Sequence, residues 1–166
     1  MTDGPAAQAA SGRRPVRSAG PAVLARRPAS GGWLLEQAFP GTADQVRHVR
    51  SAVRTVLDGC GAEETAVHLF SELSANAVLH SRSGRKGGEF TVRLRHAPSD
   101  YVWGEVEDAG SEKWGGDLAA SAREQSGLFL VTALAKACGA ADQPGWRRAV
   151  WFCIPCHPVH AGDDGR

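Results

Sequence analysis

The pattern of hydrophobic and polar residues predicts a helix early in the chain. Between residues 42 and 57, apolar side chains recur every three or four positions, which is the repeat of one helix face. These residues are Val46, Val49, Val53, Val56 and Leu57. Thr42 and Gln45 have the spacing of a capping box at the start of this helix. Gly59 follows the last apolar residue and marks the end of the helix.

A second and longer helix is expected over residues 63–81, EETAVHLFSELSANAVLHS. Its core-facing stripe is expected to contain Leu69, Phe70, Leu73 and Ala77. Glu72 and Asn76 are four residues apart, so they share one helix face beside this stripe. For this pair alone, two solvated polar residues are the simpler interpretation. The alternative is a carboxylate and a carboxamide that line the edge of a cleft.

Four segments have the composition or the alternation of β-strands. They are residues 32–39, 89–96, 101–108 and 147–155. The second and third are separated by the turn Pro98-Ser99-Asp100, so they are expected to form a hairpin. The last strand alternates Val150, Phe152 and Ile154 with other residues, and we expect it to be central in the sheet.

A long polar segment and a third helix lie between the last two strands. Residues 109–125 contain several glycines and no period, which is long for a plain connection and indicates a lid. A helical pattern then begins at Ser126, is closed by Gly139 and carries Leu128, Val131, Leu134, Ala135 and Cys138. The order of elements predicts an α+β fold, a two-layer sandwich with helices on one face of a mixed β-sheet.

Composition divides the 166 residues into one domain and two tails. Residues 1–31 hold almost no large apolar side chains, so we expect a disordered tail, a domain over 32–156 and a flexible end over 157–166. The domain is mildly acidic and lacks alternating basic and aromatic residues, which argues against a nucleic-acid partner. There is no signal peptide and no apolar run of membrane length, so a cytoplasmic protein without a membrane partner is expected.

The four cysteines are expected to be reduced thiols, because a domain of this size does not need disulfides for stability. They are Cys60, Cys138, Cys153 and Cys156. Cys153, Cys156 and His157 match the C-x-x-C-H pattern of haem attachment, but no export signal accompanies it. The same residues with His160 are a candidate zinc set, although no second ligand pair at zinc-finger spacing is present.

Three separated segments carry a resemblance to a known superfamily: ELSANAVLHS (72–81), EDAG (107–110) and SGLFLV (126–131). They resemble the N, G1 and G2 boxes of the histidine-kinase-like ATP-binding domains, which include gyrase, heat-shock chaperone and mismatch-repair proteins. With the final segment Val150 to Pro155, the chain looks most similar to the stand-alone anti-sigma-factor serine/threonine kinases. The resemblance implies a Bergerat-type fold that binds ATP and Mg²⁺.

The resemblance also implies a role for individual residues. Glu72 would be the catalytic base, and Asn76 would hold Mg²⁺ through its amide oxygen. Asp108 would accept a hydrogen bond from the adenine amine, and Gly110 would let the backbone approach the base. The start of the third helix would bind the nucleotide phosphates with Ser126, Gly127 and Leu128.

The third box departs from the usual G-x-G, because this chain has Gln125-Ser126-Gly127. Two functions therefore stay open. One is a kinase that phosphorylates a small antagonist protein of the STAS type and controls transcription through a sigma factor. The other is a nucleotide-binding partner switch without kinase activity. The resemblance also suggests a homodimer.

A two-component histidine kinase is a weaker alternative. It would need a dimerising helical hairpin that carries a phosphoacceptor histidine, and only one helix precedes Glu72. Within the second helix, the periodicity puts His68 on a partly exposed face and His80 near the cleft.

Overall fold

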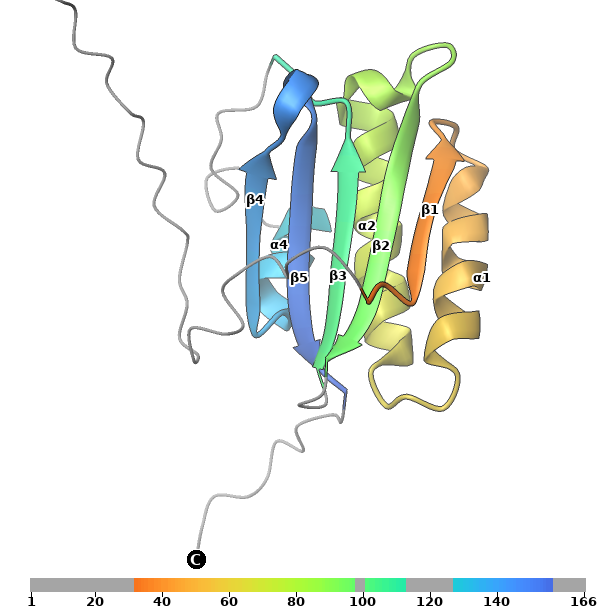
Figure 1. Cartoon of the computed structure of the whole chain (residues 1–166), viewed down its shortest axis with the longest axis vertical. Helices are drawn as coiled ribbons and strands as arrows, with labels where there is room; N and C mark the ends of the chain where they lie inside the picture. Colours follow the sequence, from red (N-terminus) through yellow and green to blue (C-terminus); the bar gives the residue numbers. More distant parts are fainter. Residues whose placement is uncertain (1–31, 98–100, 113–126, 157–166) are drawn as a thin grey trace, which may run out of the picture.

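The computed structural model describes residues 32–97, 101–112 and 127–156. They form two layers, a five-stranded sheet and a layer of helices on one of its faces (Figure 1). The helices are α1 (Gln45–Leu57), α2 (Glu63–His80) and α4 (Gly127–Leu134), with short 3-10 helices η1 (Arg82–Gly84) and η2 (Pro144–Trp146). The strands are β1 (Leu35–Pro40), β2 (Glu89–Ala97), β3 (Tyr101–Asp108), β4 (Ala137–Asp142) and β5 (Arg148–Pro155). The expected α+β two-layer sandwich is confirmed.

The strand order is β1-β2-β3-β5-β4, and every pairing between the described strands is antiparallel. The sequence had suggested a mixed sheet. That part of the prediction is wrong, because the described strands pair only in antiparallel fashion. A helix leading from β3 directly to the last strand would favour a parallel crossover. Here β4 intervenes and reverses the chain, so β5 runs antiparallel to both of its neighbours. The expected hairpin of β2 and β3 is present, and β5 is an interior strand.

The third predicted helix ends early, and strand β4 begins where the last residues of that helix were expected. Helix α4 ends at Leu134, and Ala137–Asp142 pairs with β5 along its length. The segment ACGAAD has no β-branched or aromatic residue, so its own composition does not indicate a strand. Small side chains are needed beside the Trp151 ring on β5, because a Cβ on Gly139 would lie only 2.8 Å from Cζ2 of Trp151. Packing against β5 decides this conformation.

Helix α1 begins later than the capping box predicted. It starts at Gln45, and Asp44 at the N-cap position makes no side-chain capping bond. The Thr42 hydroxyl donates to Asp44 Oδ1 at 2.6 Å, and the Gln45 amide donates to Asp44 Oδ2 at 2.9 Å. Both partners of the predicted box are thus bound to the residue between them. The end is as expected, since Gly59 has a left-handed φ of +77° just after the helix.

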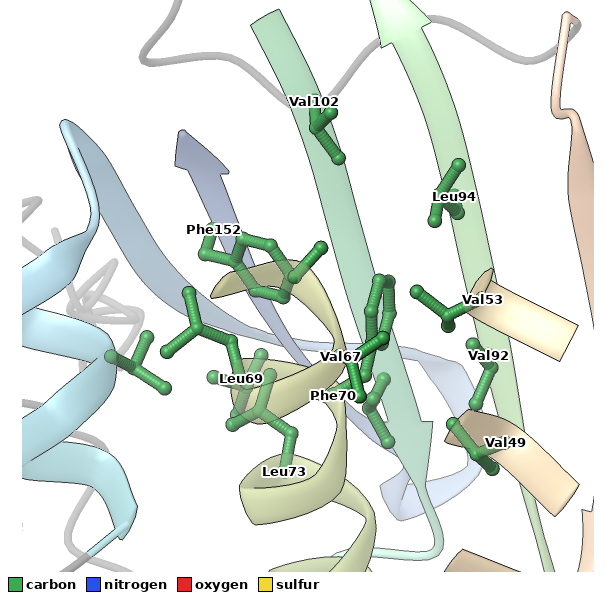
Figure 2. Close-up of a cluster of buried hydrophobic side chains, with 14 of the residues drawn as sticks. Val49, Val53, Val67, Leu69, Phe70, Leu73, Val92, Leu94, Val102 and Phe152 are labelled. Carbon is green, nitrogen blue, oxygen red and sulfur yellow. The ribbon is translucent and has the colours of Figure 1, made fainter. Parts of the chain in front are cut away.

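The core lies between the helices and the sheet (Figure 2). The apolar stripe predicted for α2 is fully inside it, and so are the alternate residues of β2, which are Phe90, Val92 and Leu94. At the centre, Phe70 and Phe152 meet edge to face with ring centroids 5.0 Å apart. Gly104 on β3 leaves room for them, because a Cβ there would lie 2.6 Å from Phe70 Cζ. This packing fixes α2 across the middle of the sheet.

The opposite face of the sheet carries a charged network. Arg93 Nη1 donates to Glu105 Oε1 at 2.8 Å and to Glu107 Oε2 at 2.7 Å, and the Glu105 side chain is fully buried. Burial alone would raise the pKa of Glu107, but hydrogen bonds from Arg93 and Arg147 outweigh it and lower that pKa. Arg93 is therefore the shared partner of two buried carboxylates, and Arg147 also pairs with Glu107.

Cys60 and Cys156 are joined by a disulfide, which corrects the expectation of four reduced thiols. Their Cα atoms are 6.0 Å apart although 96 positions separate them in sequence. The connection between α1 and α2 meets the end of β5, and sequence spacing gives no sign of this contact. Cys138 and Cys153 are free.

Several sequence predictions fall outside the described residues. These are the tails over 1–31 and 157–166 and, beyond residue 112, the lid expected over 109–125. Within the described part of the chain, no helix has both the length and the apolar character that crossing a membrane requires.

Candidate functional site

A cavity of about 210 Å³ lies where the helix layer meets the end of β3 and the start of β5. Its walls come mainly from helices α2 and α4 and strands β3 and β5, which are far apart in sequence. The lining residues are Leu73, Asn76, His80, Ser81, Val106, Asp108, Ser111, Leu128, Arg148 and Val150. Four of the lining side chains are apolar, and the polar groups converge on the same space, as in many small-molecule sites.

Helix α2 supplies one wall through residues that recur at helical spacing. Leu73, Asn76 and His80 all line the cavity. The sequence periodicity predicted His80 to lie near a cleft, and the structure places it there. The Asn76 amide nitrogen is buried, and it has no hydrogen-bond partner among the described residues. Buried polar atoms are nearly always paired, so this amide indicates a polar ligand. Rotation of the carboxamide presents either its oxygen or its nitrogen to the cavity.

Glu72 lies one turn earlier, at the edge of the cavity rather than in its wall. Its side chain is 35% exposed, and Oε1 is 3.9 Å from Nε2 of His68. On its other side is the start of α4, where a Cβ on Gly127 would lie 2.9 Å from Glu72 Cβ. The structure therefore brings two of the predicted residues, Glu72 and Gly127, into contact.

The opposite wall is the end of β3, where Asp108 points to the helix layer. Its Oδ1 accepts a hydrogen bond of 2.6 Å from the Gly110 backbone N–H, which closes a short turn. Gly110 has a left-handed φ of +69°, and a Cβ there would collide with the backbone carbonyl oxygen of Trp146. Glycine is thus required at this position, and it fixes the direction of the Asp108 carboxylate.

Two residues that sequence analysis did not single out, Arg82 and Ser83 in η1, hold this turn against α2. The Arg82 side chain donates from Nε to the Ala109 carbonyl at 3.0 Å, and its backbone N–H donates to the Gly110 carbonyl at 2.9 Å. The Ser83 hydroxyl accepts from the Ala109 N–H at 2.9 Å and donates to the Glu89 carbonyl at 2.6 Å. The residues just after α2 therefore link the two walls of the cavity directly.

Electrostatics around Asp108 set its protonation. Burial raises its pKa, while the Gly110 N–H and the positive charges of Arg148 and Arg147 act in the opposite direction. Arg148 also lines the cavity, and its guanidinium is 3.2 Å from Asp142 Oδ1. Arg148 was not among the predicted residues, because it was read only as the start of a strand.

The seven predicted site residues fall into four groups. Asn76, Asp108 and Leu128 line one cavity. Gly110 positions Asp108, and Glu72 touches Gly127 at the cavity edge. Ser126 lies outside the described residues, so the phosphate contacts expected of it stay a prediction. The buried, unpaired Asn76 amide and the facing Asp108 carboxylate fit a polar nucleotide with its metal ion.

Comparisons with known proteins agree with the fold. No family model and no curated protein matches the chain. A solved structure of the RsbU and RsbW domains of Rv1364c from Mycobacterium tuberculosis is similar, with a TM-score of 0.55 and 20% identity. The match covers 73% of this chain and 32% of that chain, so it spans about a third of the length of that protein chain.

The SiaB–SiaC complex from Pseudomonas aeruginosa gives a second match, with a TM-score of 0.53 and 16% identity. It covers 74% of this chain and 89% of that chain. At these identities the two structures establish the fold, and the chemistry has to be argued from the residues of the cavity.

Proposed function

We propose that this protein is an ATP-binding regulator that transfers the γ-phosphate of ATP to a serine or threonine of a small STAS-type antagonist protein. Through that partner it controls a sigma factor and hence transcription. The observation that carries the proposal is that Asn76 and Asp108 line the same cavity, and that the buried Asn76 amide nitrogen has no hydrogen-bond partner in the described part of the chain. We propose that it acts in the cytoplasm and as a homodimer.

Asp108 and Gly110 would select the base. The carboxylate already accepts the Gly110 N–H through Oδ1, and a carboxylate has a second oxygen that can accept from the exocyclic amine of adenine. Leu73, Val106 and Val150 offer the apolar surface that the flat base needs. A guanine, which has a carbonyl in place of that amine, would bring two acceptors together and bind poorly.

Asn76 would hold Mg²⁺ through its amide oxygen, and the ion would keep several waters and contact the phosphates. When bound, Mg²⁺ supplies positive charge that offsets the charge of the transferring phosphoryl group. Glu72 lies one turn before Asn76 on the same helix, and in this proposal its carboxylate would face the attacking hydroxyl. Glu72 would accept the proton of that hydroxyl as its oxygen bonds to phosphorus and ADP leaves.

A second candidate is a nucleotide-dependent partner switch without phosphoryl transfer. Two observations favour it. Glu72 lies outside the cavity wall and faces His68, and the Gln125-Ser126-Gly127 triplet lacks the first glycine of the usual motif. In this case the nucleotide would only shape the surface that binds the partner.

One experiment separates the two candidates. The full-length protein is incubated with Mg²⁺, γ-labelled ATP and an antagonist domain encoded beside it, and labelled serine or threonine is measured. The kinase proposal predicts transfer by the wild type and loss of transfer in Glu72→Gln with ATP affinity retained. ATP binding without transfer to any such partner supports the switch instead. A wild type that does not bind ATP contradicts both.

A further inference from the structure

Three side chains of the kinds that bind soft metal ions meet at the end of the fold away from the cavity. They are Cys60 between α1 and α2, His96 on β2 and Cys156 just after β5. Their ligand atoms all lie within 4.8 Å of one another. Two thiolates and an imidazole are a ligand set that zinc sites commonly use.

The topology explains why these residues meet. His96 follows Phe90, Val92 and Leu94 at alternate positions of β2, so it is on the helix-facing side of the strand. Cys156 comes two residues after the buried Ile154 at the end of β5. The connection after α1 is held in place, because the Cys60 N–H donates to the Leu57 carbonyl at 2.8 Å and the Glu63 N–H donates to the Cys60 carbonyl at 3.0 Å.

The cluster is distinct from the cavity described above. Tyr101 pairs with Pro155 at the cluster end of β3, whereas Asp108 pairs with Arg148 at the cavity end. Seven strand steps of about 3.3 Å put these ends roughly 23 Å apart. Figure 1 shows the same separation, with the α1–α2 connection and the end of β5 at the bottom of the view and the end of β3 at the top.

We propose that Cys60, His96 and Cys156 bind Zn²⁺ or a similar soft divalent ion when the disulfide between the two cysteines is reduced. Zinc binds sulfur at about 2.3 Å and imidazole nitrogen at about 2.0 Å, so tetrahedral ligand atoms lie about 3.5 Å from one another. The observed cluster needs only small side-chain movements to reach this spacing. His96 is exposed, so a water completes the fourth position from the solvent side.

The metal and the disulfide exclude each other, because both use the same two sulfur atoms. A dithiol reductant gives two electrons and two protons to the Cys60–Cys156 disulfide and itself becomes a disulfide. The two thiols then lose their protons to solvent as their sulfurs bind the ion. Hydrogen peroxide takes two electrons from the bound thiolates and two protons from solvent; its O–O bond breaks to give two waters, the S–S bond reforms and the ion is released. The loop between α1 and α2 is therefore joined to the end of β5 in both states, by the disulfide when oxidised and by the bound ion when reduced.

This set differs from the C-x-x-C-H pattern in the sequence. Cys153 lies on the other face of β5, in a buried cluster with Trp103 and Trp151. It does not share a site with Cys156. In the structure, the residues that lie beside Cys156 are Cys60 and His96, which are remote from it in sequence.

The test is a titration of the reduced, desalted full-length protein with Co²⁺ under anaerobic conditions. We expect one Co²⁺ per chain, with thiolate charge-transfer absorption in the near ultraviolet and intense tetrahedral bands in the visible, and displacement by one equivalent of Zn²⁺. Cys60→Ser and Cys156→Ser should lose these bands, and His96→Ala should bind more than about tenfold more weakly. Cys138→Ser is the matched control and should bind like the wild type. The disulfide form should not bind.

Three results would overturn the proposal. The first is a reduced wild type that shows no thiolate-to-cobalt absorption. The second is equal binding by the reduced and disulfide forms. The third is loss of binding in His157→Ala together with unchanged binding in His96→Ala. Circular dichroism of each variant shows whether it is folded, and His96→Ala tests the site even where a cysteine variant fails to fold. No readout depends on nucleotide binding.

Discussion

Gly127 at the start of α4 lies directly against Glu72 on α2, so close that a Cβ on Gly127 would be 2.9 Å from Glu72 Cβ and would meet the carboxylate itself. The residue proposed as the base is therefore in contact with the first residue of α4, which belongs to the third motif. The altered triplet Gln125-Ser126-Gly127 retains the glycine that this contact requires.

This contact predicts that Gly127→Ala displaces Glu72. We expect a stability loss of about 1–3 kcal/mol, as is usual for overpacking, and phosphoryl transfer at least about tenfold slower. The measurements are urea unfolding and the transfer assay. Gly59→Ala is the control, because Gly59 has no atom within 4 Å of an added Cβ and lies away from the cavity. It should lower stability through its left-handed φ alone and leave transfer unchanged.

Asp108→Asn should weaken ATP binding by about 10- to 150-fold, the equivalent of losing a charge-assisted hydrogen bond of about 1.5–3 kcal/mol. The Asn oxygen can still accept the Gly110 N–H, and the remaining amide group is a donor that opposes the adenine amine. Calorimetric titration with ATP measures this. Equal affinity in the variant would contradict the proposed base pocket.

The same variant gives a prediction on stability and pH. Burial raises the Asp108 pKa above its unfolded value of about 3.9, so its charge destabilises the folded state at neutral pH. That cost disappears as the pH falls through the folded pKa to the unfolded one. We expect Asp108→Asn to gain stability relative to the wild type at pH 7, and the gain to shrink by pH 4. A gain that is constant with pH would show that burial of the charge is not its cause.

Arg93→Met should destabilise the protein by about 3 kcal/mol or more, because it leaves the buried Glu105 and Glu107 carboxylates without their shared partner. The Glu107 pKa is lowered in the folded state, so this network stabilises above the unfolded pKa and the benefit is lost as pH falls through the folded pKa. The variant should therefore be closest to the wild type in acid. Arg95→Met, two positions along the same strand face, is the control in denaturant unfolding. Equal effects of the two substitutions would contradict the account.

The elements with strong periodicity could be predicted from the sequence. Helix α2 and the β2–β3 hairpin have the expected bounds within one residue, because a sustained apolar stripe or strict alternation has one way to reach the core. Strand β4 could not be predicted, since its small residues form a strand only through pairing with β5. Antiparallel pairing throughout the sheet follows from β4 and was missed with it.

The site was only partly predictable for a related reason. Asn76 and Asp108 stand in recognisable motifs, and the fold places both on one cavity. The Arg82 and Ser83 side chains bind the backbone carbonyl and N–H of Ala109. Every residue has such backbone groups, so the sequence gives no sign that these two side chains hold the site together. Cys60, His96 and Cys156 come together only through the tertiary fold.

The most direct test of the central claim, that the Asn76–Asp108 cavity binds ATP with Mg²⁺, is isothermal titration with ATP in the presence and absence of Mg²⁺. We predict that the wild type binds one ATP per chain and binds it more tightly with Mg²⁺. Asn76→Ala should bind as the wild type does without Mg²⁺ and gain nothing when Mg²⁺ is added, whereas Glu64→Ala, exposed on the same helix, should keep the gain. A wild type that binds no ATP, or an Asn76→Ala protein with the full Mg²⁺ effect, would contradict the claim.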